Sequence, residues 1–285
     1  VMHGYSNVPT LAQSAEDWRS MSERGVAVLV VRVRGYPGSQ LDCGQLVHHA
    51  AAGPGGGGMW ITHGLGRPLN EKGCGTEWVF AHAVADAVNA CRALRSFLGG
   101  RLPIFMHGES LGAGLAIVAA SQLADAGPPA RMAIGLPSMG DWPWRISRSE
   151  PALGIGGLVR SFVADHHEQQ TDILTTLRVL DTAVHARRVL CPVLCKLAIR
   201  DEVVPAPSAA AVFNALASSP GTKWRHVVRY GHCDGGIADA RRHSAFERMA
   251  HEFLDPVVEV MSLDWETDMG QHTRGATRAA SAGPE

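Results

Sequence analysis

Residues 106–114 read MHGESLGAG, and the rest of the chain can be placed around them. A short apolar run, Leu102 to Met106, comes before this stretch, and an Ala-rich run, Leu115 to Leu123, follows it. The pattern predicts a strand, a sharp turn and a helix, with Ser110 at the tip of the turn. The glycines that flank Ser110 permit a backbone turn that larger side chains would block. We therefore expect a serine hydroxyl raised above a sheet, beside the backbone N–H of the next residue.

Predicted strands and helices alternate along most of the chain. Strands are predicted over residues 26–33, 102–106, 131–136, 191–199 and 223–230, and helices over residues 11–24, 76–98, 115–123, 208–217 and 237–254. The first of these strands is a nearly continuous β-branched run, which is typical of a strand buried on both faces. Alternation of this kind predicts an α/β fold with a mainly parallel sheet and helices on both faces.

Three segments have other expected roles. Residues 137–188, which include a glycine cluster at 154–157, interrupt the alternation, and we expect them to form an inserted lid. Residues 40–75 are expected to be a loop. Residues 262–285 are polar and rich in Gly, Ala and Thr, so we expect a disordered tail after a single domain of residues 1–261.

Composition supports one large domain. With 46% hydrophobic and 19% charged residues among 285, the chain has enough apolar side chains for a sizeable core. A net charge of −1 argues against nucleic acid or an anionic membrane surface as a partner, and no apolar run is long enough to span a bilayer. Six cysteines without C-x-x-C spacing indicate a reduced, cytoplasmic compartment. Val1 and Met2 resemble the end of a strand, so we expect N-terminal strands to be missing and infer nothing from the lack of a signal peptide.

Candidate partners for Ser110 follow two of the predicted strands. A serine hydroxyl becomes a good nucleophile only when a base removes its proton and a carboxylate orients that base. In proteins with this strand–turn–helix motif the chain order is serine, acid, histidine. Asp201 and His232 each follow a predicted strand in that order, with Glu202 and Asp234 as alternative acids. Both strand ends belong to the edge where open α/β sheets place their ligands.

An oxyanion formed at Ser110 would need two backbone N–H donors. One is expected from Leu111, directly after the serine. The other is expected from the turn after the preceding strand of the sheet, which points to Tyr5 in the sequence His3-Gly4-Tyr5. A donor of this kind changes rates by about 10²–10³ in comparable sites.

Motifs along most of the chain carry a family resemblance. They are HGY at 3–5, RG at 34–35, WITHG at 60–64, DAV at 86–88, the serine stretch at 106–114, Asp201 followed by Pro205, and FN at 213–214. On these residues the chain resembles the acetyl xylan esterase and cephalosporin C deacetylase group of α/β-hydrolases, carbohydrate esterase family 7. The resemblance runs from His3 to about Leu254 and implies the α/β-hydrolase fold and a homo-oligomer.

The resemblance also implies a role for each matching site residue. Ser110 would be the nucleophile, Asp201 the acid and His232 the base, with Tyr5 and Leu111 as oxyanion donors. The chain departs from the family at its three signature motifs. Tyr36 stands where the family has Gln, Leu111-Gly112-Ala113 stands where it has Gln-Gly-Gly, and Cys233 stands where it has Glu after the histidine.

The expected activity is hydrolysis of acetyl or other short-chain esters of carbohydrates or small molecules, through an acyl-enzyme. The alternatives are another α/β-hydrolase activity, on peptides or xenobiotic esters, and a non-catalytic scaffold of the same fold. No cofactor is expected. The histidine pairs at 48–49 and 166–167 have no third ligand at a suitable spacing, so no metal site is expected either.

Overall fold

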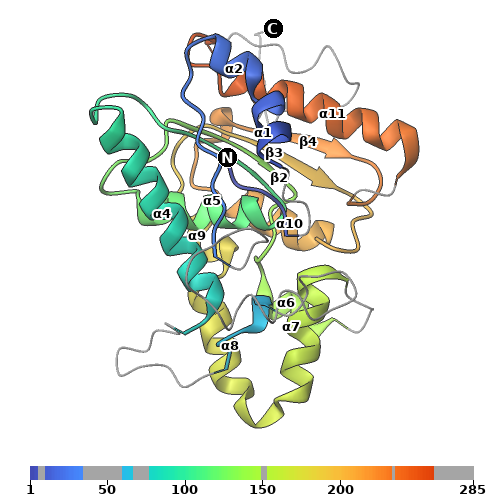
Figure 1. Ribbon diagram of the computed structural model, residues 1–285. Helices are drawn as coiled ribbons and strands as arrows, with labels where there is room; N and C mark the ends of the chain where they lie inside the picture. Colours follow the sequence, from blue (N-terminus) through green and yellow to red (C-terminus); the bar gives the residue numbers. More distant parts are fainter. Residues whose placement is uncertain (6–9, 35–59, 67–76, 149–152, 233–234, 260–285) are drawn as a thin grey trace, which may run out of the picture.

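The computed structural model describes residues 1–5, 10–34, 60–66, 77–148, 153–232 and 235–259. Within these residues a parallel sheet has four strands in the order of the chain: β1 (Phe105–Glu109), β2 (Arg131–Gly135), β3 (Val193–Ala198) and β4 (Lys223–Val228) (Figure 1). Each pair of neighbouring strands is joined by at least one helix, as parallel pairing requires. The α/β class predicted from the alternation is therefore confirmed.

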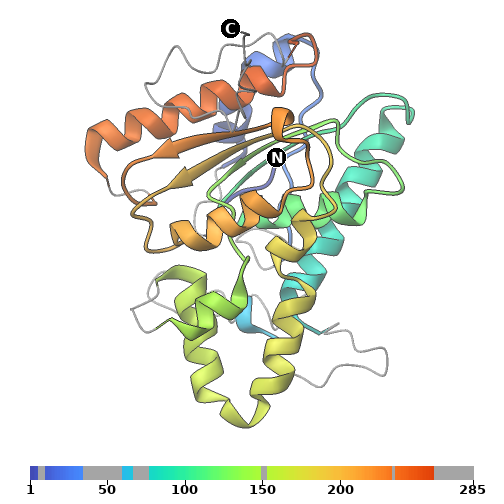
Figure 2. The ribbon, with the colours of Figure 1, turned by 180° about the vertical axis from the view of Figure 1, so that it is seen from behind.

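Helices cover both faces of the sheet. One face carries α1 (Leu11–Asp17), α2 (Arg19–Glu23) and α11 (Gly236–Phe253), and the other carries α4 (Val79–Phe97), α5 (Leu111–Gln122), α9 (Thr182–Ala186) and α10 (Ala206–Ala215) (Figures 1 and 2). The described residues also form three short 3₁₀ helices, η1 (Trp60–Thr62), η2 (His167–Gln169) and η3 (Pro220–Thr222). In the described part of the chain, no helix combines the length and the apolar character needed to cross a bilayer.

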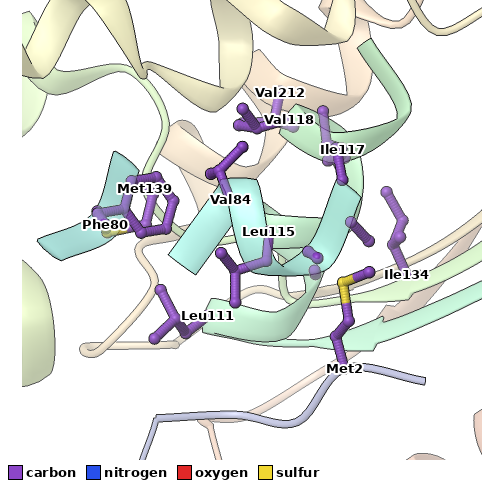
Figure 3. Close-up of a cluster of buried hydrophobic side chains, with 14 of the residues drawn as sticks. Met2, Phe80, Val84, Leu111, Leu115, Ile117, Val118, Ile134, Met139 and Val212 are labelled. Atoms are coloured by element: carbon purple, nitrogen blue, oxygen red, sulfur yellow. The ribbon is translucent and has the colours of Figure 1, made fainter. Parts of the chain in front are cut away.

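Helix α5 lies at the centre of the larger core. It is rich in small residues, and all of its residues from Leu111 to Ser121 are buried. Figure 3 shows Leu111, Leu115 and Val118 of this helix among side chains from α4, α10 and the sheet. A helix that is apolar on every side needs partners on every side. The sheet, α4 and α9 supply them, so the helix that begins directly after Ser110 is held firmly.

The segment predicted as a lid is helical. It contains α6 (Trp142–Ser147), α7 (Gly154–Asp165), α8 (Gln170–Val179) and then α9, and the first three project away from the sheet in both views (Figures 1 and 2). Asp181 ties the two ends of this segment together. Its carboxylate accepts hydrogen bonds from the N–H groups of Asp141 and Trp142, both at 2.9 Å, and from Ala183.

The strand predicted over residues 26–33 is not a regular strand, and this expectation was wrong. Only Val31 forms a bridge, parallel to Met2, and Met2 forms a second parallel bridge to Gly108. Leu29 and Val31 exchange hydrogen bonds with Val1, and Val26 donates to the carbonyl of Met21 at 3.1 Å. A strand needs one continuous hydrogen-bonded neighbour, which these scattered partners do not provide. Met2 nevertheless lies between the run and β1, which places the His3-Gly4-Tyr5 turn beside the end of β1.

Several boundaries also differ from the expected ones. The helix predicted over 11–24 is broken at Trp18, whose ring packs between the rings of His107 and His251. The strand predicted over 102–106 begins at Phe105, because Pro103 lacks an N–H for the ladder and Leu102 is exposed. The helix predicted over 76–98 begins at Val79.

Other expectations concern residues that the structure leaves undescribed. Thr76, the predicted N-cap, is one of them. Most of the predicted loop at 40–75 and the whole predicted tail at 262–285 lie outside the described residues as well, as do Tyr36, Cys233 and Asp234.

Candidate active site

The turn at Ser110 has the geometry of a sharp strand-to-helix elbow. Ser110 has φ 53° and ψ −115°, a conformation that a residue with a side chain seldom adopts. Its N–H donates to the carbonyl of Gly135 on β2 at 2.8 Å, and its own carbonyl accepts from Ser138 N–H at 3.3 Å. These contacts hold the turn from both sides, so the surrounding structure maintains the strained backbone.

The glycines two residues before and after Ser110 are required by close packing. A Cβ at Gly108 would lie 2.8 Å from the backbone nitrogen of Ala113. A Cβ at Gly112 would lie 2.6 Å from the carbonyl oxygen of His3 and would overlap the carbonyl of Met2. Real Cβ atoms do not approach backbone atoms so closely. Glycine at 112 thus allows α5 to contact the segment that leads into the His3-Gly4-Tyr5 turn.

Asp201 and His232 meet at the ends of neighbouring strands. Oδ2 of Asp201 lies 2.8 Å from Nδ1 of His232, and the Asp201 side chain is fully buried. Oδ1 of the same carboxylate accepts two backbone hydrogen bonds, from Val203 and Val204, both at 2.8 Å. Both carboxylate oxygens of Asp201 therefore have hydrogen-bond partners. The carboxylate contacts only Nδ1 of the imidazole and leaves Nε2 without a contact to Asp201.

Buried Arg145 supports the loop that carries Asp201. Its guanidinium donates to the carbonyl of Val203 at 3.2 Å and packs over the ring of Trp142. Burial lowers the pKa of Arg145 to about 10, an effect that the carboxylates of Asp201 and Asp181 oppose. Arg145 thus stays cationic at neutral pH and connects α6 to the Asp201 loop.

The two residues predicted as N–H donors both lie next to Ser110. Leu111 is the first residue of α5, and N–H groups in the first turn of a helix have no partner within the helix. The His3-Gly4-Tyr5 turn lies against the serine, because a Cβ built at Gly4 would be 3.5 Å from Cβ of Ser110. Burial raises the pKa of the Tyr5 hydroxyl strongly, so the side chain is neutral.

A single cavity joins these parts. Its volume is about 550 Å³, and Ser110 and His232 both line it. Its lining includes apolar side chains, such as Tyr5, Ile155 and Val203. It also includes polar and charged groups from α11, β1 and the end of α1, namely Asp17, His107, Glu109, Glu247 and His251. The predicted lid contributes Ser138, Gly154 and Ile155 to the wall.

Next to this cavity lies a group of charged side chains that the sequence analysis did not single out. Lys196 of β3 is 2% exposed, and its Nζ lies 2.9 Å from Oε1 of Glu109 and 3.6 Å from Oε1 of Glu247. The other Glu247 oxygen lies 3.2 Å from Nε2 of His107. Burial alone would raise the pKa of Glu247, but His107, Lys196 and His251 outweigh it and lower the pKa. A lysine within a predicted strand of a sheet with helices on both faces was the available signal, since buried lysines need partners.

The histidine pairs offer no metal site among the described residues. His166 stacks on Phe162 with ring centroids 4.1 Å apart and contacts its carbonyl oxygen, while His167 is exposed beside Glu168. In the described ranges, no group of three or more His, Cys, Asp or Glu side chains is arranged to hold an ion. The pair at 48–49 lies outside the described residues.

A parallel sheet with a strained serine after β1, and an Asp–His pair after β3 and β4, defines an α/β-hydrolase. Comparison with known proteins gives the family. The model of the acetyl xylan esterase (AXE1) family matches residues 1–264, so the chain belongs to the acetyl xylan esterase family, whose members are carboxylic ester hydrolases. The resemblance noted in the sequence is thereby confirmed. No curated protein sequence matches the chain.

Solved structures agree with this fold. The acetyl xylan esterase from Paenibacillus sp. R4 is 24% identical, with a TM-score of 0.63 over 88% of this chain and 72% of that one. Acetyl xylan esterase 1 from Thermoanaerobacterium sp. JW/SL YS485 is 18% identical, with a TM-score of 0.59 over 87% of this chain and 73% of that one. A cold-adapted esterase from an Arctic intertidal metagenomic library is 17% identical, with a TM-score of 0.50 over 89% of this chain and 80% of that one.

Proposed function

We propose that this chain is a serine esterase that removes acetyl groups from polar alcohols, with Ser110, His232 and Asp201 as its catalytic triad. The observation that carries the proposal is the arrangement of these residues. His232 is held by Asp201 at 2.8 Å and lines the same cavity as Ser110, whose hydroxyl stands on a strained elbow. Membership of the acetyl xylan esterase family supports the choice of acetyl esters.

The proposed reaction has two halves. In the first, His232 Nε2 takes the proton of the Ser110 hydroxyl as Oγ attacks the ester carbonyl, and the alcohol leaves with that proton. In the second, water attacks the acetyl-serine, with His232 again as base, and acetate leaves. Asp201 holds the imidazole with its Nδ1 protonated. The oxyanion would be stabilised by the N–H groups of Leu111 and Tyr5.

The lining of the cavity supports the substrate class. Apolar side chains such as Tyr5, Ile155 and Val203 would contact the short acyl group. The lining also carries carboxylates and imidazoles, such as Glu247 and His251, which form hydrogen bonds with hydroxyl groups. A sugar alcohol fits this mixed lining, and the Paenibacillus and Thermoanaerobacterium relatives are named for acetylated xylan.

The test compares hydrolysis of p-nitrophenyl acetate and of acetylated xylo-oligosaccharides by the wild type and by Ser110→Ala. We expect the variant to lose at least about 10³-fold in kcat with an unchanged melting temperature. Ser121→Ala is the matched control, since Ser121 is a buried serine of α5 whose hydroxyl contacts His185 instead of the cavity. Near-wild-type turnover in Ser110→Ala, after exclusion of a contaminating esterase, refutes the mechanism. An inactive wild type favours the non-catalytic scaffold.

A further inference from the structure

One row of residues crosses the sheet at the level of the serine elbow. Glu109 of β1 pairs with Gly135 of β2, and Gly135 pairs with Lys196 of β3. Glu109 and Lys196 are therefore two strands apart, a backbone separation of roughly 9.5 Å. Their side chains nevertheless meet, with Nζ of Lys196 2.9 Å from Oε1 of Glu109. The ion pair thus passes over the middle strand.

Gly135 makes this crossing possible. A Cβ at that position would lie 2.6 Å from Cδ of Glu109 and 2.8 Å from Cε of Lys196. The backbone at Gly135 is outside the positive-φ region, so its conformation does not itself require glycine. A methyl group there would displace the ends of both charged side chains from their present contact. Glu109, Gly135 and Lys196 consequently form one unit, which we call the cross-sheet bridge.

Two side chains of helix α11 also contact the bridge. Nζ of Lys196 lies 3.6 Å from Oε1 of Glu247 and 4.7 Å from the centre of the Phe246 ring. Burial favours the neutral amine, but the two carboxylates outweigh it and raise the pKa of Lys196. The bridge therefore contains a buried cation whose two carboxylate partners compensate for the cost of its burial.

Two of these three residues adjoin the backbone of the elbow, and the third is bonded to the residue after Gly135. Glu109 directly precedes Ser110, and the carbonyl of Gly135 accepts the Ser110 N–H at 2.8 Å. Leu136, which follows Gly135, donates to the carbonyl of Lys196 at 2.9 Å. Ser110 is in a conformation that persists only while its surroundings enforce it. The bridge fixes the residue before Ser110 by its side chain, and the sheet fixes Ser110 by its backbone.

We propose that Lys196 is a positioning residue for Ser110, which acts by holding Glu109 across Gly135. This inference rests on the proposed function, because it assumes that Ser110 is the nucleophile. Without the bridge, the end of β1 would lose its side-chain anchor and the hydroxyl would shift from its line of attack. Displacements of about 1 Å in catalytic groups can cost about 10²-fold in rate.

The test uses three variants of the bridge. Lys196→Met removes the cation, Glu109→Gln keeps the shape of the partner without its charge, and Lys196→Arg keeps the cation. We expect Lys196→Met to lower kcat for p-nitrophenyl acetate by about 10–100-fold with KM within about twofold, because Lys196 itself does not line the cavity. Glu109→Gln should also lower kcat, but by a smaller factor than Lys196→Met. Lys196→Arg should show no more than half of the drop in log kcat that Lys196→Met shows.

Asp86→Asn is the matched control. Asp86 forms a partly buried, two-pronged ion pair with Arg34, and neither residue lines the cavity of Ser110. This control should lower the melting temperature and leave kcat unchanged. A serine-directed organophosphate measures the concentration of active sites in each preparation. Dividing each rate by that concentration gives a kcat that excludes unfolded protein.

The outcomes separate two kinds of failure. If Lys196→Met and Glu109→Gln lower only the melting temperature, as Asp86→Asn does, the bridge is structural and the inference is wrong. If both bridge variants raise KM without lowering kcat, the residues act on substrate binding, and the inference is again wrong. If Ser110→Ala retains activity, it is the proposed function that fails.

Discussion

Replacing Asp201 by asparagine should remove nearly all esterase activity and leave the protein folded. The carboxylate uses Oδ1 for two backbone N–H groups, of Val203 and Val204, and Oδ2 for Nδ1 of His232. An asparagine has only one oxygen. Two donors face the Oδ1 position, so the amide oxygen will occupy it and the NH₂ group will face the imidazole.

An NH₂ group at that position reverses the hydrogen bond to His232. Nδ1 must then accept, so the proton of the neutral imidazole moves to Nε2, the nitrogen that would otherwise take the proton of Ser110. The wrong tautomer costs about 10⁴-fold in kcat in comparable triads, or about 5.5 kcal/mol of transition-state stabilisation. The backbone hydrogen bonds survive, so the free energy of unfolding should change by less than about 1.5 kcal/mol.

Steady-state hydrolysis of p-nitrophenyl acetate and thermal unfolding measure the two quantities. Asp201→Ala is the informative comparison, because it leaves the N–H groups of Val203 and Val204 without their acceptor and should destabilise the fold by about 1–3 kcal/mol for each. A folded Asp201→Asn enzyme that keeps kcat within about tenfold of wild type would show that the tautomer argument is wrong. An Asp201→Asn protein that is inactive because it is unfolded would also contradict it.

Two further perturbations test the close contacts around Ser110. Gly112→Ala places a methyl group against the carbonyls of Met2 and His3, so the elbow helix or the His3-Gly4-Tyr5 turn must move. We expect about a 10²-fold loss of kcat, and an Ala variant with wild-type kcat would show that this approach is not needed. Burial is the main cause that lowers the pKa of His3 to about 4, and the nearby His107 and Arg32 act in the same direction, so the folded protein disfavours its protonation. The stability gained from neutral His3 is complete above the ordinary imidazole pKa of about 6.5 and is lost as pH falls from there toward 4. Melting temperatures between pH 7 and 4 should therefore fall less in His3→Gln than in the wild type, and equal slopes would exclude His3 as a source of the dependence.

The sheet could be predicted from the sequence because its strands are local apolar runs. Residues 131–136, 191–199 and 223–230 were each predicted as strands, and β2, β3 and β4 lie within them. The run at 26–33 has the same composition, yet strand formation depends on a neighbour elsewhere in the chain. The early end of α1 likewise depends on Trp18 packing between His107 and His251, which local propensity does not describe.

The candidate site, too, could be predicted from the sequence only in part. Ser110, Asp201 and His232 could be selected because parallel strands present their carboxyl ends at one edge, and chain order then limits the choice. Their catalytic roles remain a proposal. The cross-sheet bridge could not be predicted, because its two charged residues are 87 positions apart in the numbering and meet only through the register of three strands and a missing side chain at Gly135.

The spread of the candidate triad along the chain makes enzymatic activity a late event in folding. Ser110 follows β1, Asp201 follows β3 and His232 follows β4, the strand at one border of the four-stranded sheet. These contacts join residues far apart in sequence, and such contacts form slowly because loop-closure entropy must be overcome first. A partly folded chain that has docked α5 on β1 and β2 already contains the elbow, but it has neither the proposed acid nor the proposed base. During refolding, secondary structure will therefore return before turnover does, and during synthesis the chain will become active only after β4 has been made and has joined the sheet.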